Sequence, residues 1–288
     1  MDLGDFLIEP GRKVNLARIP TDATGSYRKK EEAEEKLVKD IGRLAELQEL
    51  LYASATHAVL LIVQAMDAAG KDGVIKHVMS GVNPQGCRVA SFKEPSAEEL
   101  RHDYLWRCVR ELPPRGFIGI FNRSYYEEVL TVRLHPELLA RQNLPPGCLG
   151  KKIWEQRFED ITNFERYLSR NGTAIVKVFL HVSKEEQKRR FLERLDDPEK
   201  TWKYSPHDLG EREYWDRYME LYGEAITATS SSWAPWHVVP ADHKWFTRIA
   251  VADLLVRTLK EFALSSPPVP PEVKKSLKEA RRRLKGGG

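Results

Sequence analysis

The sequence predicts an α/β fold in which helices cover both faces of a parallel sheet. Short apolar, β-rich runs alternate along the chain with segments of helical periodicity, the pattern typical of a parallel sheet. A second observation is the loop at residues 64–73, QAMDAAGKDG, which joins the first apolar run to a helical pattern. The length of 288 residues suits one large α/β domain, or such a domain with an insertion.

The elements follow in order from these patterns. Residues 1–28 are predicted to form an irregular arm, because prolines and glycines interrupt them. A charged helix follows, and its apolar residues recur at helical spacing on one face: Leu37, Ile41, Leu44, Leu47 and Leu51. Five runs are predicted to be buried strands, at residues 59–63, 88–92, 117–121, 175–180 and 236–239.

Helix starts and the end of the chain carry local signals. Ser96 with Glu99, and Ser183 with Glu186, have the spacing of capping boxes. Residues 265–288 combine a proline-rich stretch with a basic run, so a flexible basic tail is predicted there. The body of the protein is then expected at residues 29–264.

Composition limits the classes of function. The 46 Lys and Arg residues nearly balance the 42 Asp and Glu residues, and a net charge of +4 does not by itself mark a nucleic-acid-binding protein. Three widely spaced cysteines without a C-x-x-C pair favour a reducing compartment over disulfides or structural zinc. No secretory signal or membrane-length apolar run is seen. We therefore expect a soluble cytoplasmic protein without nucleic-acid or membrane partners.

The loop at residues 64–73 has the arrangement of a phosphate-binding loop. A strand, a glycine-containing turn, Lys71 and a helix follow one another, so loop N–H groups, the helix dipole and an ammonium group can all face an anion. The pattern departs from G-x-x-x-x-G-K-[ST], because Ala65 replaces the first glycine and Asp72 the hydroxyl residue. An ordinary strand-to-helix turn with a surface lysine is the alternative interpretation.

Two carboxylates in this loop need an explanation. Asp67 would repel an anion unless a cation lay between them, which predicts a metal-side or phosphate-orienting role with Mg²⁺ as the cation. Asp72 is interpreted instead as a carboxylate in the first helical turn, where the dipole favours negative charge.

Polar residues also follow the third predicted strand. Asn122 can supply an oxygen ligand or hold water, and Arg123 can bind a phosphate through two hydrogen bonds. The alternative is a capped helix start, with Ser124 as the cap and Glu127 and Glu128 in the first turn. The two interpretations are compatible, because a helix N-terminus is itself an anion site.

A basic segment follows the fourth predicted strand. Residues 188–203, KRRFLERLDDPEKTWK, could close over the same sheet edge as Lys71, and this predicts a lid around residues 188–222. The alternative is a charged helix face with pairs such as Glu186 and Arg190. The position after the fourth strand favours the lid.

Several motifs together resemble the polyphosphate kinase 2 family, over about residues 30–263. They are residues 64–73, 92–96 (FKEPS), 102–107 (HDYLWR), 121–127 (FNRSYYE), 202–203 (WK) and 216–218 (DRY). The resemblance implies a P-loop three-layer α/β/α sandwich with a helical lid that forms homodimers or homotetramers. It also implies Mg²⁺-dependent transfer of the terminal phosphate of inorganic polyphosphate to a nucleotide, with Mn²⁺ as a substitute metal. The 121–127 motif is most similar to the subgroup that accepts AMP and ADP, although Tyr125 departs from the histidine expected there.

The resemblance also assigns roles to residues. Asp67, Lys71 and Arg123 match the catalytic positions, and Asp67 and Asn122 lie near the metal. The nucleotide is expected to contact residues on two segments: Lys93, Asn122, Arg123, Glu127, Glu128 and Arg133. The phosphate chain is expected to contact the loop and the basic segment: Ala68, Ala69, Gly70, Lys71, Asp72, Gly73, Arg189, Arg190, Arg194 and Lys203.

Two other functions remain as alternatives. An ATP-dependent nucleoside monophosphate kinase would be expected to carry a hydroxyl residue where Asp72 stands. A non-catalytic polyphosphate- or nucleic-acid-binding protein would use the basic segment at residues 188–203 without turnover.

Overall fold

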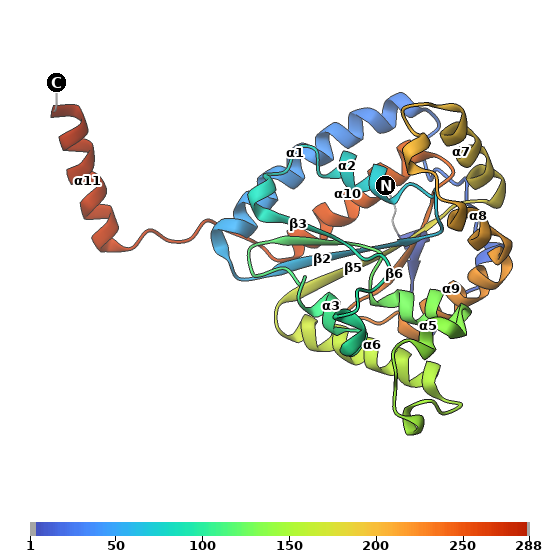
Figure 1. Ribbon diagram of the computed structural model, residues 1–288. Helices are drawn as coiled ribbons and strands as arrows, with labels where there is room; N and C mark the ends of the chain where they lie inside the picture. Colours follow the sequence, from blue (N-terminus) through green and yellow to red (C-terminus); the bar gives the residue numbers. More distant parts are fainter. Residues whose placement is uncertain (1–3, 287–288) are drawn as a thin grey trace.

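A six-stranded sheet forms the centre of the protein, seen here in a computed structural model that describes residues 4–286 (Figure 1). Residues 1–3 of the predicted arm and 287–288 of the predicted tail lie outside the described residues, as does the side chain of Lys203. The strand order is β1-β6-β5-β2-β4-β3. The strands are β1 (Leu7–Ile8), β2 (Ala58–Ala65), β3 (Cys87–Ser91), β4 (Ile118–Asn122), β5 (Thr173–His181) and β6 (Trp236–Pro240).

The five predicted strands are confirmed as a parallel set, β2 to β6. The prediction of a five-stranded parallel sheet is wrong in one respect, because β1 adds a sixth strand antiparallel to β6. This strand comes from the segment predicted to be an irregular arm. Ile8 and Phe6 are buried there, and the Ser230 hydroxyl donates to the carbonyl of Ile8. A strand of two residues has no detectable period, so the sequence could not reveal it.

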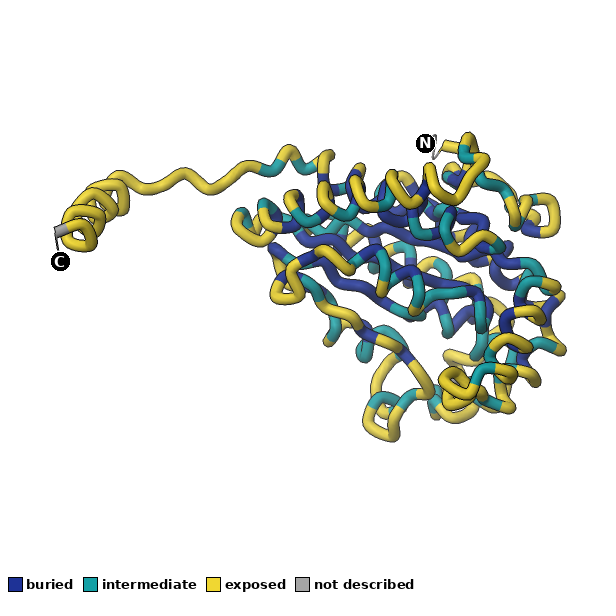
Figure 2. Tube along the Cα trace, turned by 90° about the horizontal axis from the view of Figure 1, so that it is seen from above, coloured by how far each residue is buried: buried dark blue, intermediate teal, exposed yellow. Residues whose placement is uncertain are grey.

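Helices cover both faces of the sheet, as the three-layer prediction required. Figure 1 shows α1, α2 and α10 above the sheet and α3 and α6 below it, while Figure 2 shows the buried strands between exposed outer helix faces. The helices are α1 (Lys30–Ser54), α2 (Lys71–Val78), α3 (Trp106–Val109), α4 (Thr131–Leu134), α5 (Pro136–Ala140), α6 (Ile153–Arg170), α7 (Lys184–Asp196), α8 (Pro206–Glu213), α9 (Trp215–Thr229), α10 (Lys244–Glu261) and α11 (Pro271–Gly286). No helix within the described range is long and apolar enough to cross a bilayer.

Both predicted capping boxes are present, one of them complete. The Glu99 carboxylate accepts from the Ser96 N–H at 2.7 Å, and the Ser96 hydroxyl accepts from the Glu99 N–H at 3.2 Å. The Ser183 hydroxyl accepts from the Glu186 N–H at the start of α7. These caps begin the segments that follow β3 and β5 at the carboxyl edge of the sheet.

The predicted tail and the predicted lid both contain helices. The segment predicted as a flexible basic tail contains the helix α11, which stands away from the rest of the protein (Figure 1). The predicted lid consists of α7, the single turn η7 (Thr201–Lys203), α8 and the start of α9. The rest of α9 belongs to the core, where Leu221 and Ile226 are fully buried.

A buried ion pair connects β5 to α6. The Lys177 ammonium lies 2.6 Å from the Glu165 carboxylate, and both side chains are fully buried. Lys177 also donates to the Tyr126 hydroxyl and to the carbonyl of Thr229, and the hydroxyls of Tyr125 and Tyr126 donate to Glu165. Because the two tyrosines begin the turn η5 (Tyr125–Val129), this network fixes the segment directly after Arg123.

We expect Lys177→Met to lower the free energy of unfolding by about 3–5 kcal/mol, because it leaves the Glu165 carboxylate buried without its cation. Urea denaturation would measure the loss. Adding Glu165→Gln should recover part of it, because the uncompensated charge is then removed. A loss below about 1 kcal/mol for the single variant would contradict this account.

Candidate active site

The loop between β2 and α2 is built around two left-handed residues and a buried lysine. Ala68 has φ 58° and Gly70 has φ 109°, conformations that turn the chain sharply into α2. The Lys71 ammonium donates to the carbonyls of Ala65 and Met66, at 2.9 and 3.2 Å. Burial lowers the pKa of Lys71, although the charge of Asp67 opposes this effect. The first N–H groups of α2 have no acceptor within the helix, so this end of the loop is suited to bind an anion.

Asp67 and Arg123 meet across the ends of neighbouring strands. The Arg123 guanidinium donates to the Asp67 carboxylate at 2.6 Å, and the Lys71 ammonium lies 3.9 Å from the same oxygen. Burial acts to raise the pKa of Asp67, but Lys71 and Arg123 together outweigh it and hold the pKa below its usual range. The three predicted catalytic residues therefore form one cluster with an ionised carboxylate.

The backbone of Arg123 explains how this cluster forms. Asn122 is the last residue of β4 and pairs with Val63 of β2, and the Arg123 N–H donates to the carbonyl of Val63. Arg123 then adopts φ 64°, which is uncommon for a residue with a side chain and is typical of functional sites. At this residue the chain turns out of β4, and the Arg123 guanidinium reaches Asp67 in the loop after β2.

Asn122, Asp72 and Glu127 complete the polar edge. The Asn122 amide donates to the Asp72 carboxylate at 2.7 Å, which explains why a carboxylate stands at this loop position. Glu127 accepts from the Gln64 amide and from the Thr131 hydroxyl. Its charge is the main cause that raises the pKa of Arg123, ahead of opposing burial. Glu127 and Asp67 therefore face the same guanidinium.

The chemistry of this edge fits a divalent cation shared with a ligand. Among the described residues, no group of three or more His, Cys, Asp or Glu side chains could hold a metal ion by itself. Asp67 offers a carboxylate oxygen, and Asn122 offers an amide oxygen because its nitrogen is the atom that donates to Asp72. A hard cation prefers such oxygens and takes its remaining ligands from phosphates and water.

Side chains of helix α7 bind backbone carbonyls of the loop between β2 and α2. The Arg190 guanidinium donates to the carbonyls of Ala68 and Ala69, and also to those of Ala241 and Asp242. The Gln187 amide donates to the carbonyl of Asp67 at 2.9 Å. Arg190 was predicted to contact polyphosphate, but it is buried and these contacts give it a positioning role under the loop.

The other basic residues of the lid region lie elsewhere. Arg189 is exposed and pairs with Glu186 and Glu193 along α7, which is the charged-face arrangement considered from the sequence. Arg194 pairs with Asp208 of α8 at 3.4 Å. For Lys203 only the backbone, in η7, is described. Arg190 is therefore the predicted lid cation that the structure places against the loop.

Three residues predicted to contact the nucleotide lie outside the Asp67 cluster. Glu128 is buried and accepts from Arg157 and Gln142. Arg133 lies 2.6 Å from Glu224 and faces the ring of Trp154. Lys93 is exposed, and its carbonyl accepts from Arg107.

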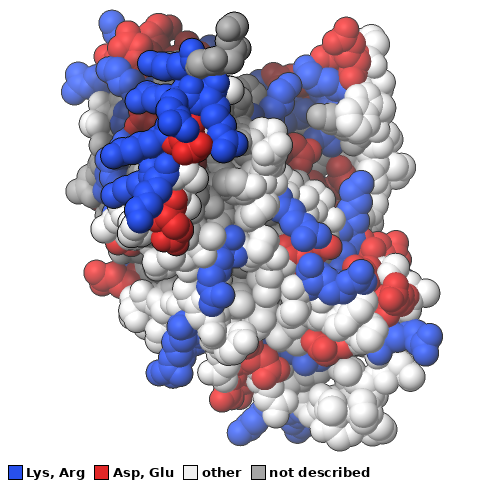
Figure 3. Space-filling model, turned by 90° about the vertical axis from the view of Figure 1, so that its left-hand side faces the viewer, with Lys and Arg blue, Asp and Glu red and all other residues white. Residues whose placement is uncertain are grey.

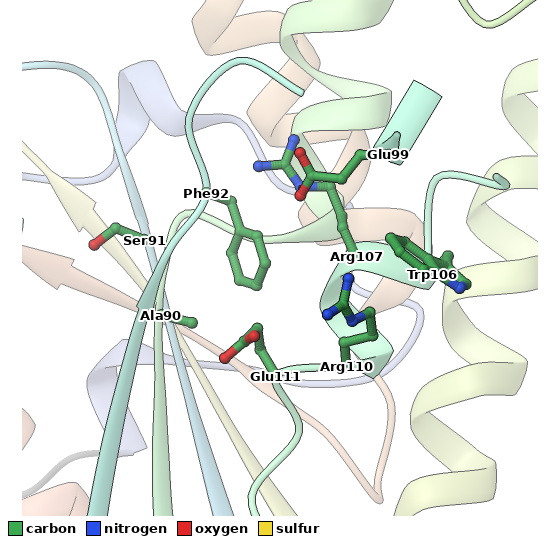
Figure 4. Close-up of a pocket in the computed structure, with 8 residues that line it drawn as sticks. All are labelled: Ala90, Ser91, Phe92, Glu99, Trp106, Arg107, Arg110 and Glu111. Atoms are coloured by element: carbon green, nitrogen blue, oxygen red, sulfur yellow. The ribbon is translucent and has the colours of Figure 1, made fainter. Parts of the chain in front are cut away.

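Arg107 belongs to a separate pocket of about 270 Å³ beside β3 (Figure 4). The guanidinium of Arg107 lies over the ring of Phe92, and that of Arg110 lies over Trp106. The carboxylate of Glu99 is 3.2 Å from Arg107. The motif at residues 102–107 therefore holds the segment that carries Lys93.

The sequence did not single out two further groups near the loop. Asp208 of α8 lies close enough to the cluster that burial and then the charge of Asp67 raise its pKa. Gln187 precedes the basic segment by one residue and has no charge to mark it. No local sequence signal distinguishes either from an ordinary surface residue, because tertiary packing alone brings them to the loop.

A parallel α/β sheet with a lysine-containing anion loop after one strand and an arginine after its neighbour defines a P-loop phosphotransferase. The comparison with protein families makes the class more specific. The family described as Polyphosphate kinase 2 (PPK2) matches residues 27–266, and the chain belongs to this family.

Individual relatives agree with this assignment. The chain is 53% identical over 280 residues to an "ADP-polyphosphate phosphotransferase" of Rhodopseudomonas palustris, covering 97% of each protein. It is 46% identical over 263 residues to an "AMP/ADP-polyphosphate phosphotransferase" of Meiothermus ruber, covering 91% of this chain and 94% of the relative. The crystal structure of polyphosphate kinase 2 from Arthrobacter aurescens TC1 superposes with a TM-score of 0.85 at 41% identity, over 96% of this chain and 95% of that one.

We expect Arg190→Gln to weaken tripolyphosphate binding by about tenfold, because the loop loses charged hydrogen bonds that fix its carbonyls. Isothermal titration calorimetry would measure the dissociation constant. Arg43→Gln is the matched control, because Arg43 is exposed on α1 and pairs only locally with Glu46. Equal affinity of the two variants would contradict the positioning role.

Proposed function

We propose that this enzyme transfers the terminal phosphate of inorganic polyphosphate to AMP and to ADP. The observation that carries the proposal is the single cluster of Asp67, Lys71 and Arg123 in a chain of the polyphosphate kinase 2 family. The relatives named for AMP and ADP acceptors support the choice of nucleotides. Cytoplasmic location belongs to the same proposal and fits the free cysteines Cys87, Cys108 and Cys148. Assembly into homodimers or homotetramers stays a prediction.

The reaction needs alignment more than covalent chemistry. An oxygen of the acceptor's phosphate forms a bond to the terminal phosphorus of the chain, and the bond from that phosphorus to the bridging oxygen breaks. The bridging oxygen stays on the shortened polyphosphate as its new terminal oxygen. The attacking phosphate oxygen is already ionised, so no side chain has to remove a proton.

The residues of the cluster then have distinct roles. The first N–H groups of α2 and the Lys71 ammonium bind the donor phosphates, and Arg123 neutralises the charge on the phosphoryl group in transfer. Asp67 holds Arg123 in place, and its carboxylate would also hold the divalent cation that phosphotransferases of this family need. We propose Mg²⁺, with Mn²⁺ as a substitute, held by Asp67 and the amide oxygen of Asn122. When bound, this cation neutralises charge on the phosphates.

The lid and the nucleotide side complete the proposal. Arg189 is proposed to contact the phosphate chain from α7, and Arg194 and Lys203 to approach it when the segment beyond Arg190 closes over the loop. Lys93, Glu127, Glu128 and Arg133 are proposed to shape the nucleotide pocket, with Glu128 and Arg133 acting through the partners that hold them.

The donor decides between this proposal and an ATP-dependent monophosphate kinase. The protein is incubated with AMP, Mg²⁺ and either polyphosphate or ATP as the donor. We expect ADP to form from AMP when polyphosphate is the donor. With ADP in place of AMP, polyphosphate should give ATP. Chromatography of the nucleotides measures the products.

Arg123→Ala should lower kcat with polyphosphate by about 10³-fold, because the phosphoryl group in transfer loses the cation that neutralises its charge. ADP formation from AMP with ATP alone as donor would overturn the proposal.

We expect kcat/KM to fall at alkaline pH before the ordinary lysine pKa of 10.5 is reached. Burial lowers the pKa of Lys71, so its ammonium loses its proton below pH 10.5. The donor phosphates then lose the positive charge that binds them. Lys71→Arg should remove this alkaline limb from whatever activity it retains, because arginine stays charged. A profile that is unchanged in Lys71→Arg would contradict the assignment.

A further inference from the structure

The helix α11 carries a strong positive charge that the site described above does not use. Its basic residues are Lys274, Lys275, Lys278, Arg281, Arg282, Arg283 and Lys285. The carboxylates in this helix are Glu272 and Glu279. Figure 3, which views the molecule from the side on which α11 lies, shows a dense group of Lys and Arg side chains at the upper left.

The positive net charge of the whole protein comes from this helix. The chain has 46 Lys and Arg and 42 Asp and Glu residues, a net charge of +4. Residues 265–288 account for seven of the cations and two of the carboxylates, so residues 1–264 keep 39 and 40 and carry a net charge of −1. A body of negative net charge gives no long-range attraction for a polyanion, whereas a net charge of +5 on one tail segment does.

All these cations are available to a ligand. Residues 265–285 are exposed throughout, and Figure 2 shows the segment as a continuous exposed tube. Two of its arginines, Arg282 and Arg283, pair with Glu279 of the same helix. Such exposed pairs contribute little and are readily exchanged for a ligand.

We propose that α11 is an accessory binding site for long inorganic polyphosphate, tethered to the enzyme so that it captures the substrate chain away from the catalytic loop. This rests on the proposed function, which makes polyphosphate the donor. Every phosphate of such a chain is charged, so the density of negative charge matches seven cations on one short helix. Capture at a second point raises the local concentration of the chain at the loop without changing the chemistry there.

The composition of α11 favours this ligand over three others. Its apolar stripe, Val273, Leu277, Ala280 and Leu284, could pair with a second copy, but pairing would bring two helices of the same strong charge together. The helix has no aromatic residue. It therefore lacks the rings that anchor interfacial helices in lipid and those on which nucleic-acid bases stack.

The position of the segment that joins α10 to α11 predicts that binding depends on the length of the polyphosphate chain. Phe262, just after α10, stacks on His57, which precedes β2, so the tail leaves at the start of the strand while the loop lies at its end. The eight residues of β2 separate these ends by about 26 Å. A proline-rich linker and α11 then lead away from the body. A short chain in the loop cannot reach α11, whereas a long chain can contact both.

The test compares two variants of equal charge change. The first combines Arg281→Gln, Arg282→Gln and Arg283→Gln in α11. The matched control combines Lys29→Gln, Lys30→Gln and Lys39→Gln, which neutralises three exposed lysines at the start of the chain's first long helix. Dissociation constants and KM are measured for long-chain polyphosphate and for tripolyphosphate, at several salt concentrations. A third variant, with lysine at the three arginine positions, keeps the charge.

We expect the α11 variant to raise Kd and KM for long-chain polyphosphate by about tenfold, with the values for tripolyphosphate and kcat unchanged. The slope of log Kd against log salt should fall by roughly two, because three phosphate contacts are lost and each releases about 0.7 counterion. The lysine variant should behave as the parent. These results together support the inference.

The inference is overturned if the α11 variant and the control bind long chains equally well. It is also overturned if the variant instead loses binding to anionic vesicles or to single-stranded DNA, or loses self-association, while the affinity for long-chain polyphosphate stays as in the parent. Absence of phosphate transfer by the parent with both chain lengths would refute the proposed function instead. In that case the direct binding measurements still decide the role of α11.

Discussion

The structure of the active-site edge depends on the compensation of one partly buried carboxylate. Asp67 lies in a loop suited to bind anions, where a negative charge is unfavourable unless cations accompany it. Lys71 provides one of these cations from the same loop-to-helix segment, and Arg123 provides the other because the parallel pairing of β2 with β4 brings the residue after β4 to the same oxygen. The sheet therefore sets the electrostatics of the site as well as its position. A shift of one residue in this pairing would separate Arg123 from Asp67 and leave Lys71 as the nearer cation to that carboxylate.

The same edge shows how the lid and the loop are joined. Arg190 belongs to α7, yet its guanidinium binds four carbonyls on two loops, so α7 cannot move far without either breaking these bonds or taking the loop with it. The mobile part of the lid is therefore expected to begin beyond Arg190, in the η7 and α8 segment. This divides the basic segment into a fixed part that positions the loop and an outer part that can respond to ligand.

The sequence revealed the features that depend on local patterns. The apolar runs identified five strands, and the capping boxes identified two starts. The loop pattern singled out Asp67 and Lys71, the end of the third predicted strand singled out Arg123, and the three side chains lie together in the structure. It could not reveal β1, because two residues show no period, or the buried Lys177–Glu165 pair, because each residue alone resembles a surface charge. The role of Arg190 was hidden for the same reason. A run of basic residues does not say which guanidinium turns inward, because only tertiary packing decides that.

The two edges of the sheet have different consequences for the solubility and association of the protein. On one side the short β1 lies against β6 and caps part of its backbone hydrogen-bonding groups. On the other side β3 is the last strand of the described sheet, and Val89 there is 53% exposed. β3, with five residues, is therefore the longer open edge for continuation of the sheet from one copy to another. A twofold axis joins an edge to itself, so such a continuation would run two β3 strands antiparallel, within an otherwise parallel set.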